Sequence, residues 1–230
     1  PEDVIDGLKI CMKIFGLEKG YIGVESNKPD AIKALKSLND QSVEVVTLVT
    51  KYPQGAEKQL INAITKRQVP SGGLPADVGV IVLNVDTATS ISKAFRTGMP
   101  AIRRIITMSG DCIKNPQNFD TPIGMPISEL IERAGGLQQE PEKVIIGGPM
   151  MGVAQYTLDV PVIKTTSAIL ALSKAETVID ADTPCIRCGK CVDSCPMRLM
   201  PLYLNKYIRQ GNLEMAEKYH VMDCIECGLC

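Results

Sequence analysis

Residues 185–196 read Cys-Ile-Arg-Cys-Gly-Lys-Cys-Val-Asp-Ser-Cys-Pro. The spacing is C-x2-C-x2-C-x3-C-P, which is the ligand run of bacterial ferredoxins that hold two [4Fe–4S] clusters. Three cysteines two residues apart can turn around one face of an iron–sulfur cube. The fourth cysteine lies on a departing segment and ligates the other cluster. The run therefore predicts a second cysteine run elsewhere in the chain.

The second run is present at residues 224–230, which read Cys-Ile-Glu-Cys-Gly-Leu-Cys. By the crossing rule, Cys195 completes the cluster whose other ligands are Cys224, Cys227 and Cys230. The fourth ligand of the other cluster is expected beyond residue 230. We therefore expect the other site to be labile, empty or degraded to a three-iron form in this chain. Its three ligands in this sequence are Cys185, Cys188 and Cys191.

Structural zinc is the alternative for these thiols, because C-x2-C pairs also form tetrahedral zinc sites. Two triplets with this spacing and a Cys-Pro pair exceed what a four-ligand zinc site needs. The chain has nine cysteines, and all except Cys11 and Cys112 lie in these two runs. A disulfide framework would spread its cysteines through the domain. We expect Cys11 and Cys112 to be ordinary thiols that hold no metal.

The composition limits the possible classes of protein. With 230 residues, 45% of them hydrophobic, the chain can bury the cores of more than one domain. A formal net charge of −1 gives no sign of the basic patch that nucleic acid would require. The longest apolar runs, such as Ala168–Leu172, are too short for a direct membrane span. The start at Pro1, with no Met, leads us to expect a fragment of a longer polypeptide.

The first hundred residues alternate between helical and strand patterns, which favours βαβ units around a largely parallel sheet. Helices are expected over 1–15, 29–38, 56–67 and 87–95, and strands over 21–25, 43–50 and 78–85.

Residues 101–155 form a small α+β unit in this interpretation, with strands at 104–109 and 144–146 and a helix at 127–134. Residues 156–182 are expected to be connecting strands, and 183–230 a cysteine-rich helical module. Within this module a first helix should run from about Leu199 to Ile208 and end at Gly211. Asn212 should cap a second helix from Leu213.

Several stretches resemble one known family. They are Lys51–Ile61, Gly147–Gly152, Asp223–Gly228 and the first cysteine run. The resemblance is to the C subunit of the Rnf complex, a membrane-bound ferredoxin:NAD oxidoreductase that couples electron transfer to ion translocation. It implies three domains. Residues 1–100 resemble the C-terminal portion of the complex I flavin subunit, 101–155 an SLBB (soluble-ligand-binding β-grasp) domain, and 183–230 a truncated α-helical [4Fe–4S] ferredoxin domain.

The resemblance also implies a site for FMN and NAD(H), whose glycine-rich loop is expected upstream of Pro1. Gly55, Ala56 and Glu57 would occupy the turn beside flavin and nicotinamide, with Glu57 in the catalytic role. Asn84 and Thr87 would contact the flavin. Complex I relatives have a second acidic residue where Ala56 stands. From the residues alone, a glycine at a strand-to-helix turn allows a phosphate or flavin to approach the backbone, and an ordinary αβ turn is the alternative.

The implied function is electron transfer between NAD(H), FMN and two [4Fe–4S] clusters. The implied partners are the other subunits of the complex and, through it, ferredoxin. The implied location is peripheral, on the cytoplasmic face of the bacterial cell membrane, and the fragment alone is expected to be inactive. Two alternatives stay open: a cobalamin reductase of related domain order, and a relay without flavin whose N-terminal half is only a scaffold.

Overall fold

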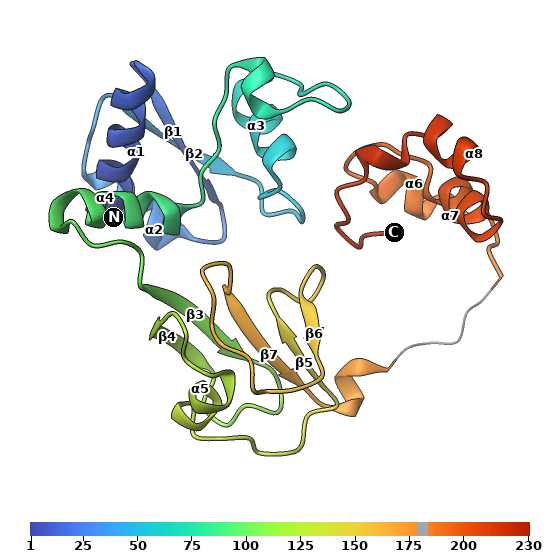
Figure 1. Cartoon of the computed structure of the whole chain (residues 1–230). Helices are drawn as coiled ribbons and strands as arrows, with labels where there is room; N and C mark the ends of the chain where they lie inside the picture. Colours follow the sequence, from blue (N-terminus) through green and yellow to red (C-terminus); the bar gives the residue numbers. More distant parts are fainter. Residues whose placement is uncertain (179–183) are drawn as a thin grey trace. The chain divides into compact units, whose positions relative to one another are not determined.

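The computed structural model describes residues 1–178 and 184–230 (Figure 1). The chain divides into two compact units. Unit 1 contains residues 1–100 with 220–223, and unit 2 contains 101–219 with 224–230. The connecting segment expected over 156–182 runs into residues 179–183. Its last part, and the domain start expected at Thr183, therefore lie outside the described residues.

Unit 1 combines helices with a parallel two-stranded sheet. β1 and β2 pair in parallel, with Gly20 opposite Val43 and Glu25 opposite Leu48. α2 makes the crossover that parallel strands require. The elements of unit 1 before the C-terminal segment are α1 (Glu2–Phe15), β1 (Gly20–Glu25), α2 (Pro29–Ser37), β2 (Val43–Leu48), α3 (Glu57–Thr65), the 3₁₀ turn η1 (Pro75–Val78) and α4 (Val85–Thr97).

α1 packs closely against α4 because Gly7 has no side chain. A Cβ at this position would lie 1.9 Å from the carbonyl oxygen of Ala88, so any other residue would push the helices apart. Beside this contact, the buried Ser92 hydroxyl donates a hydrogen bond of 2.7 Å to the Asp6 carboxylate. The amphipathic pattern expected over 1–15 thus forms a helix that covers the sheet and α4.

The strand expected over 78–85 is wrong. Val78 ends η1, Gly79 has a φ of 67°, and residues 80–84 form neither helix nor strand. An apolar, β-branched run favours a strand, but a strand also needs a neighbouring edge for its backbone hydrogen bonds. No strand of the described chain pairs with this segment. Instead, Arg67 Nη1 donates to the carbonyl oxygens of Val78, at 2.7 Å, and Gly79, at 3.2 Å.

Unit 2 contains a mixed five-stranded sheet in the order β4-β3-β7-β5-β6 (Figure 1). β3 pairs in parallel with β7, and the other three pairings are antiparallel. The sheet and its helix comprise β3 (Arg103–Ser109), β4 (Gln117–Pro122), α5 (Ile127–Arg133), β5 (Lys143–Ile146), β6 (Val153–Gln155) and β7 (Ala168–Leu172).

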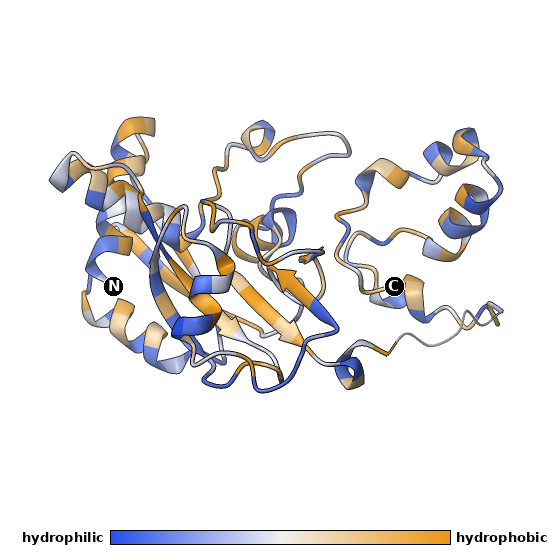
Figure 2. Cartoon of the chain, turned by 60° about the horizontal axis from the view of Figure 1, so that its bottom comes forward, coloured by the Kyte–Doolittle hydropathy of each residue, from blue (hydrophilic) through white to orange (hydrophobic). Residues whose placement is uncertain are grey.

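Sequence patterns did not indicate the two edge strands, β4 and β6. β4 carries Asn118 and Asp120 next to Phe119, so its alternation of apolar and polar residues is weak. Such polar edge strands are held chiefly by their ladder to a neighbour, here β3. The central strands, by contrast, are apolar enough to be found from sequence, as the hydropathy colouring of the sheet shows (Figure 2).

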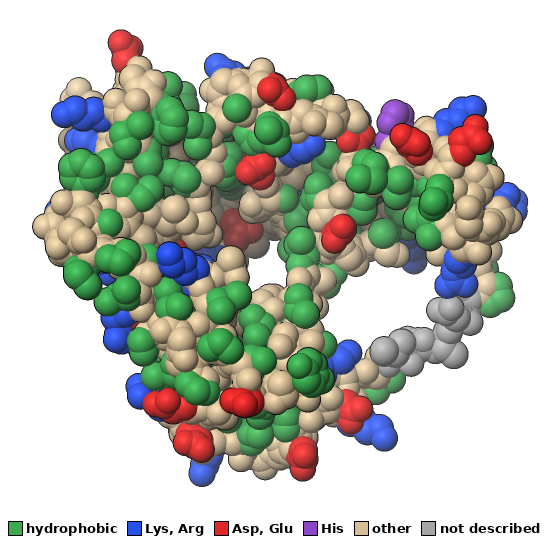
Figure 3. All heavy atoms as spheres, viewed as in Figure 1, with side chains coloured by type: hydrophobic (Ala, Val, Ile, Leu, Met, Phe, Trp, Pro, Cys, Tyr) green, Lys and Arg blue, Asp and Glu red, His purple; other side chains and the backbone are tan. Residues whose placement is uncertain are grey.

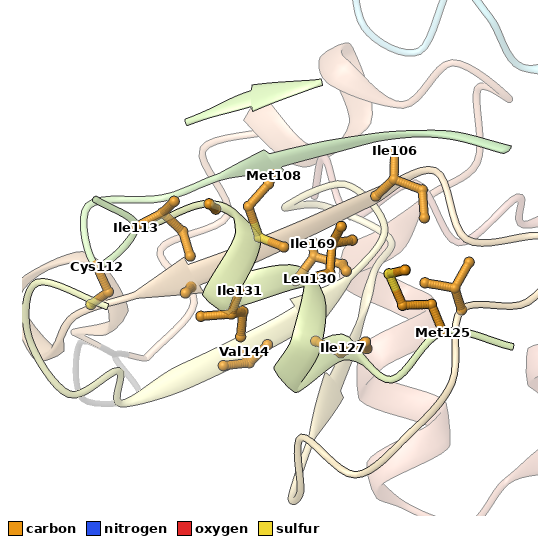
Figure 4. Packing of buried hydrophobic residues seen from close by; sticks show 13 residues of the cluster. Ile106, Met108, Cys112, Ile113, Met125, Ile127, Leu130, Ile131, Val144 and Ile169 are labelled. Carbon is orange, nitrogen blue, oxygen red and sulfur yellow. The ribbon is translucent and has the colours of Figure 1, made fainter. Parts of the chain in front are cut away.

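The main core lies between α5 and the five-stranded sheet (Figure 4). α5 contributes apolar residues at helical spacing, Ile127, Leu130, Ile131 and Ala134, which are almost entirely buried. Ile106 of β3 packs against them as part of the same cluster. This core of helix on mixed sheet holds the five strands together, and the C-terminal segment follows from the last of them in sequence, β7.

Adjacent residues of β3 provide a matched test of this core. Ile106 is 0% exposed, whereas Ile105 is 55% exposed. Ile106→Ala should lower the free energy of unfolding by about 3 kcal/mol, because it removes buried methyl groups and leaves a cavity. Ile105→Ala should cost less than about 1 kcal/mol. Urea unfolding followed by circular dichroism measures both, and equal losses would contradict the assigned register of β3.

The C-terminal segment is helical, as expected. It contains α6 (Lys190–Ser194), α7 (Pro201–Arg209), α8 (Leu213–Lys218) and the 3₁₀ turn η3 (Val221–Asp223). The side chain of Asn212 caps α8 by accepting a hydrogen bond of 3.1 Å from the backbone N–H of Met215. Tyr203, Tyr207 and Tyr219 pack together, with ring centroids 5.4 to 6.5 Å apart, and join α7 to the end of α8.

Candidate metal centres

The first three cysteines of the first run line one small cavity. Its volume is about 220 Å³, and the side chain of Leu202 from α7 closes part of it. Cys185 and Cys188 lie in an exposed loop, and Cys191 lies in the first turn of α6. The structure therefore brings Cys185, Cys188 and Cys191 together around one space, as the spacing predicts.

The two cysteine runs share the same local backbone. In each run, the residue before the second cysteine and the glycine after it have positive φ. The angles are 56° at Arg187 and 81° at Gly189 in the first run, and 52° at Glu226 and 76° at Gly228 in the second. A positive φ is unfavourable for residues with a Cβ and tends to occur at functional sites. Both runs therefore form the same kind of turn, which suits the binding of two clusters of the same kind.

Cys195 departs from the first run because a proline follows it. Pro196 disfavours helical geometry at the preceding residue. Accordingly, Cys195 ends α6 with φ −67° and ψ 116°, an extended conformation. Its Sγ accepts a hydrogen bond of 3.4 Å from the backbone N–H of Leu199. The Cys-Pro pair thus separates the fourth thiol from the other three.

The departing thiol meets the second run. Burial raises the pKa of the Cys230 thiol above its ordinary value, and the negative charges of Cys224, Cys195 and Cys227 raise it further. The Cys230 thiol is thus sensitive to the charge of Cys195 from the first run as well as to the charges of its own run. A backbone group also contacts one of these thiols: the N–H of Glu226 donates a hydrogen bond of 3.4 Å to Cys224 Sγ. A cationic centre would be needed to hold all four as thiolates.

The donor set, two C-x2-C-x2-C triplets with a Cys-Pro pair, exceeds what a four-ligand zinc site needs. Within the described residues, no group of three or more His, Cys, Asp or Glu side chains could hold one metal ion. A zinc ion would need its sulfur ligands about 2.3 Å from one centre. Thiolates around a cube of four irons stand further apart, each on its own iron. None of the seven motif cysteines is in a disulfide, so their sulfur atoms can serve as ligands.

The residues expected beside the flavin lie at two helix starts in unit 1. Ala56 is the N-cap residue of α3, and no side chain caps this helix end. Glu57 is exposed in the first turn. Apart from Gly55 itself and its two chain neighbours, no described residue lies within 4 Å of the point where a Cβ of Gly55 would stand, so this backbone is open to a ligand. An open backbone before an uncapped helix fits an anionic group.

Asn84 has a structural role that the sequence did not indicate. It is the N-cap residue of α4, and its Oδ1 accepts a hydrogen bond of 2.9 Å from the N–H of Asp86. Thr87 is exposed in the first turn of the same helix. In the described part of the chain, no hydrogen bond or ion pair joins Glu57 to Asn84 or Thr87. The structure thus places these residues at helix ends, and their contacts with flavin stay a prediction.

The remaining two cysteines belong to neither run. Cys112 is completely buried in the core of the five-stranded sheet, and burial raises the pKa of its thiol. Cys11 lies on α1 beside an apolar cavity.

On the visible face, charged side chains of both signs are mixed rather than gathered into one basic patch (Figure 3). Among the described helices, none has the length and apolar character needed to cross a bilayer.

Sequence reasoning found the cysteines but missed the features that arrange them. The left-handed residues Arg187 and Glu226 have no sequence signal beyond their place before the second cysteine of each run. The N–H bonds to Cys195 and Cys224 depend on the folded turns. Pro196, by contrast, is visible in the sequence, because it is part of the C-x2-C-x2-C-x3-C-P motif.

Three family models match successive parts of the chain. They are the Nuo51 FMN-binding domain over residues 1–93, the SLBB domain over 105–154 and the 4Fe-4S dicluster domain over 176–230. The order of domains inferred from the sequence is therefore confirmed, and so is the mixture of an α/β domain, a small α+β domain and a helical cluster domain.

Curated relatives match nearly the whole chain. The chain is 54% identical, over 96% of its length and 51% of the relative, to the C subunit of the Na⁺-translocating ferredoxin:NAD⁺ oxidoreductase complex of Acetobacterium woodii. It is 49% identical, over 96% of its length and 49% of the relative, to the proton-translocating counterpart of Clostridium ljungdahlii. The C subunit of the ion-translocating oxidoreductase complex of Rhodobacter capsulatus is 43% identical over 96% of the chain and 43% of the relative.

The chain spans about half the length of the curated relatives it matches. The alignment to the Acetobacterium woodii relative covers 96% of the chain, from the FMN-binding match to the dicluster match. The resemblance found in the sequence is thus confirmed: over nearly its whole length, the chain is similar to the C subunits of Rnf complexes.

Proposed function

We propose that this chain is the electron-transfer part of a ferredoxin:NAD oxidoreductase subunit, with a flavin side in unit 1 and two [4Fe–4S] clusters in unit 2. The observation that carries the proposal is that Cys185, Cys188 and Cys191 line one cavity, while the second run repeats the same backbone turn. Two runs of this spacing, together with the Cys-Pro pair that turns Cys195 out of α6, are the ligand pattern of a two-cluster module.

The seven cysteines would hold the two clusters. Cys195 and the three cysteines of the second run would hold one cluster. Cys185, Cys188 and Cys191 would supply three ligands to the other. When bound, the flavin handles the two electrons of a hydride, and each cluster carries one electron at a time. The chain tunes its thiolates through hydrogen bonds. The N–H groups of Leu199 and Glu226 withdraw charge from sulfur, which raises the reduction potential of the site they serve.

On the flavin side, the residues of unit 1 would bind and orient. The uncapped N-terminus of α3 attracts a negatively charged group, and the open backbone at Gly55 lets it approach. The carboxylate of Glu57 would orient the nicotinamide through hydrogen bonds. Asn84 uses Oδ1 for the cap of α4, so its Nδ2 hydrogens are the donors it would offer to flavin.

The names of the relatives support the choice of partners and coupling. Those proteins are subunits of ferredoxin:NAD⁺ oxidoreductase complexes that move Na⁺ or protons. We infer the same class of partners for this chain: other subunits of a membrane complex and, through them, ferredoxin. A peripheral position on the cytoplasmic face follows from that assignment and is part of the proposal.

Two substitutions at Asn84 separate a flavin contact from a helix cap. Asn84→Asp keeps a capping oxygen but replaces the amide donors with negative charge, so FMN should bind at least about fivefold more weakly while stability changes by less than about 0.5 kcal/mol. Asn84→Ala should also lose about 1 kcal/mol of stability. Flavin titration and thermal unfolding of the subunit measure both effects. If Asn84→Asp binds FMN as tightly as the unsubstituted protein, Asn84 is only a cap.

A further inference from the structure

Within unit 1, a loop that follows α3 holds a short piece of the C-terminal segment. Residues 220–223 belong to unit 1, although the residues on either side of them belong to unit 2. The hydroxyl oxygen of Ser71 lies 2.8 and 2.7 Å from the two carboxylate oxygens of Asp223. A serine hydroxyl has one hydrogen to donate, so the two oxygens share it. The contact joins residues that are 152 positions apart in the sequence.

The loop that carries Ser71 is a defined turn. The N–H of Gly73 donates a hydrogen bond of 3.0 Å to the carbonyl oxygen of Pro70, which makes Ser71 and Gly72 the central residues of a β-turn. Gly72 has a φ of 69°, which a glycine adopts without strain at the second central position of such a turn. The turn therefore fixes the backbone from which the Ser71 hydroxyl reaches Asp223.

Asp223 is held on its backbone as well as on its side chain. Its N–H donates a hydrogen bond of 3.0 Å to the carbonyl oxygen of His220, which closes the turn η3. Its side chain is only 17% exposed, and Nδ1 of His220 lies 4.0 Å from Oδ2, beyond hydrogen-bond distance. Ser71 is thus the closer of these two partners. A hydrogen bond to an ionised carboxylate is stronger than one between neutral groups.

Asp223 leads directly into the second cysteine run. Cys224, the first cysteine of that run, is the next residue, and neighbouring Cα atoms are about 3.8 Å apart. A shift of the Asp223 backbone therefore moves a ligand. The carboxylate also places a negative charge near the thiolates, and added negative charge lowers the reduction potential of an iron–sulfur cluster. The Ser71 hydroxyl acts on both, because it fixes the carboxylate and partly neutralises its charge.

We propose that Ser71 is a positioning residue for the cluster of the second run. Through the Asp223 carboxylate, it fixes the backbone that enters Cys224 and weakens the effect of the carboxylate's charge on the cluster. The inference rests on the proposed function, because it requires a [4Fe–4S] cluster at the second run.

Redox titrations followed by EPR test this in the full-length protein. Cys188→Ala and Cys227→Ala, each of which should remove one cluster, assign the two spectra. Ser71→Ala should lower the potential of the second-run cluster, because it leaves the charge of Asp223 without its donor. At the midpoint potential of the unsubstituted protein, the ratio of reduced to oxidised cluster should fall at least about threefold, which corresponds to about 28 mV for one electron. The potential of the other cluster should not change.

Three matched variants separate the hydroxyl from a general effect on unit 1. Ser71→Thr keeps a hydroxyl and should keep the potential. Ser37 is another exposed serine of unit 1, whose hydroxyl donates a hydrogen bond of 2.8 Å to the carbonyl oxygen of Ala34 in its own helix, so Ser37→Ala should change neither potential. Asp223→Asn removes the charge and should raise the potential of the second-run cluster. With Asp223→Asn already present, Ser71→Ala should lower that potential by less than it does alone.

The possible results divide clearly. A lower potential, or loss of iron, at the second-run cluster alone supports the positioning role. Unchanged potentials in Ser71→Ala, an equal shift of both clusters, or loss of both clusters would overturn it, and so would a potential in Ser71→Thr as low as in Ser71→Ala. If the unsubstituted protein holds no iron–sulfur cluster, the proposed function fails and the inference fails with it. If both clusters are present and Ser71→Ala leaves them unchanged, only the inference fails.

Discussion

In the full-length protein, in which both clusters are expected to have four ligands, replacement of Cys195 by alanine should remove about four irons per chain from one cluster and leave the other cluster's spectrum unchanged. The cluster lost should be the one held by Cys224, Cys227 and Cys230, although Cys195 belongs to the first run in sequence. The physical reason lies in Pro196, which turns Cys195 into an extended conformation at the end of α6. The charge of the Cys195 thiol then helps to raise the pKa of Cys230 in the second run.

Matched variants make this expectation specific. Cys227→Ala should give the same EPR spectrum of the reduced protein as Cys195→Ala, since both remove ligands of one cluster. Cys188→Ala should remove the other spectrum. Cys11→Ala, at a thiol outside both runs, should leave iron content unchanged. If Cys195→Ala instead reproduces the spectrum of Cys188→Ala, each run holds its own cluster and the crossed assignment is wrong.

Glu57→Ala is expected to slow NADH oxidation by the full-length protein in its complex at least about tenfold, which corresponds to about 1.4 kcal/mol in the barrier. Glu57 stands exposed in the first turn of α3, after the open backbone of Gly55. A carboxylate there can hold the nicotinamide in a reactive orientation through hydrogen bonds. Iron content should not change, because Glu57 belongs to unit 1 and the cysteine ligands to unit 2.

The control for Glu57 is Glu18→Ala, which removes another exposed carboxylate of unit 1. An exposed residue with no role in the site should cost a few tenths of a kcal/mol in stability and leave turnover unchanged. Steady-state oxidation of NADH with an artificial acceptor, together with the flavin content of each sample, makes the comparison. Full turnover of Glu57→Ala at full flavin occupancy would remove Glu57 from the site.

Those parts of the fold that depend on local patterns could be predicted from the sequence. α5 has apolar residues at helical spacing and ends before Gly135 and Gly136, so its limits were found within a residue. Asn212 was recognised as a cap because an asparagine after Gly211 is a typical helix start. The seven cysteines were found from their spacing alone, since few other arrangements require two such runs.

What depends on distant neighbours could not be predicted. Residues 78–85 have a strand composition, but whether they pair is decided by an edge elsewhere in the fold. β4 is held by its ladder to β3 and has little pattern of its own. Asn84 was associated with flavin through family resemblance, while its cap of α4 is visible only in the structure. In each case the deciding contact is made outside the segment itself.

The central claim is that the cysteine runs hold iron–sulfur clusters, and one measurement tests it most directly. Iron, acid-labile sulfide and zinc should be determined in anaerobically purified protein, with EPR of the reduced sample. We expect iron and sulfide in a ratio of about one, with about four irons for each complete cluster, and no stoichiometric zinc. The site of Cys195, Cys224, Cys227 and Cys230 should be filled first, because four cysteines are assigned to it and three to the other site. Stoichiometric zinc without iron would contradict the account.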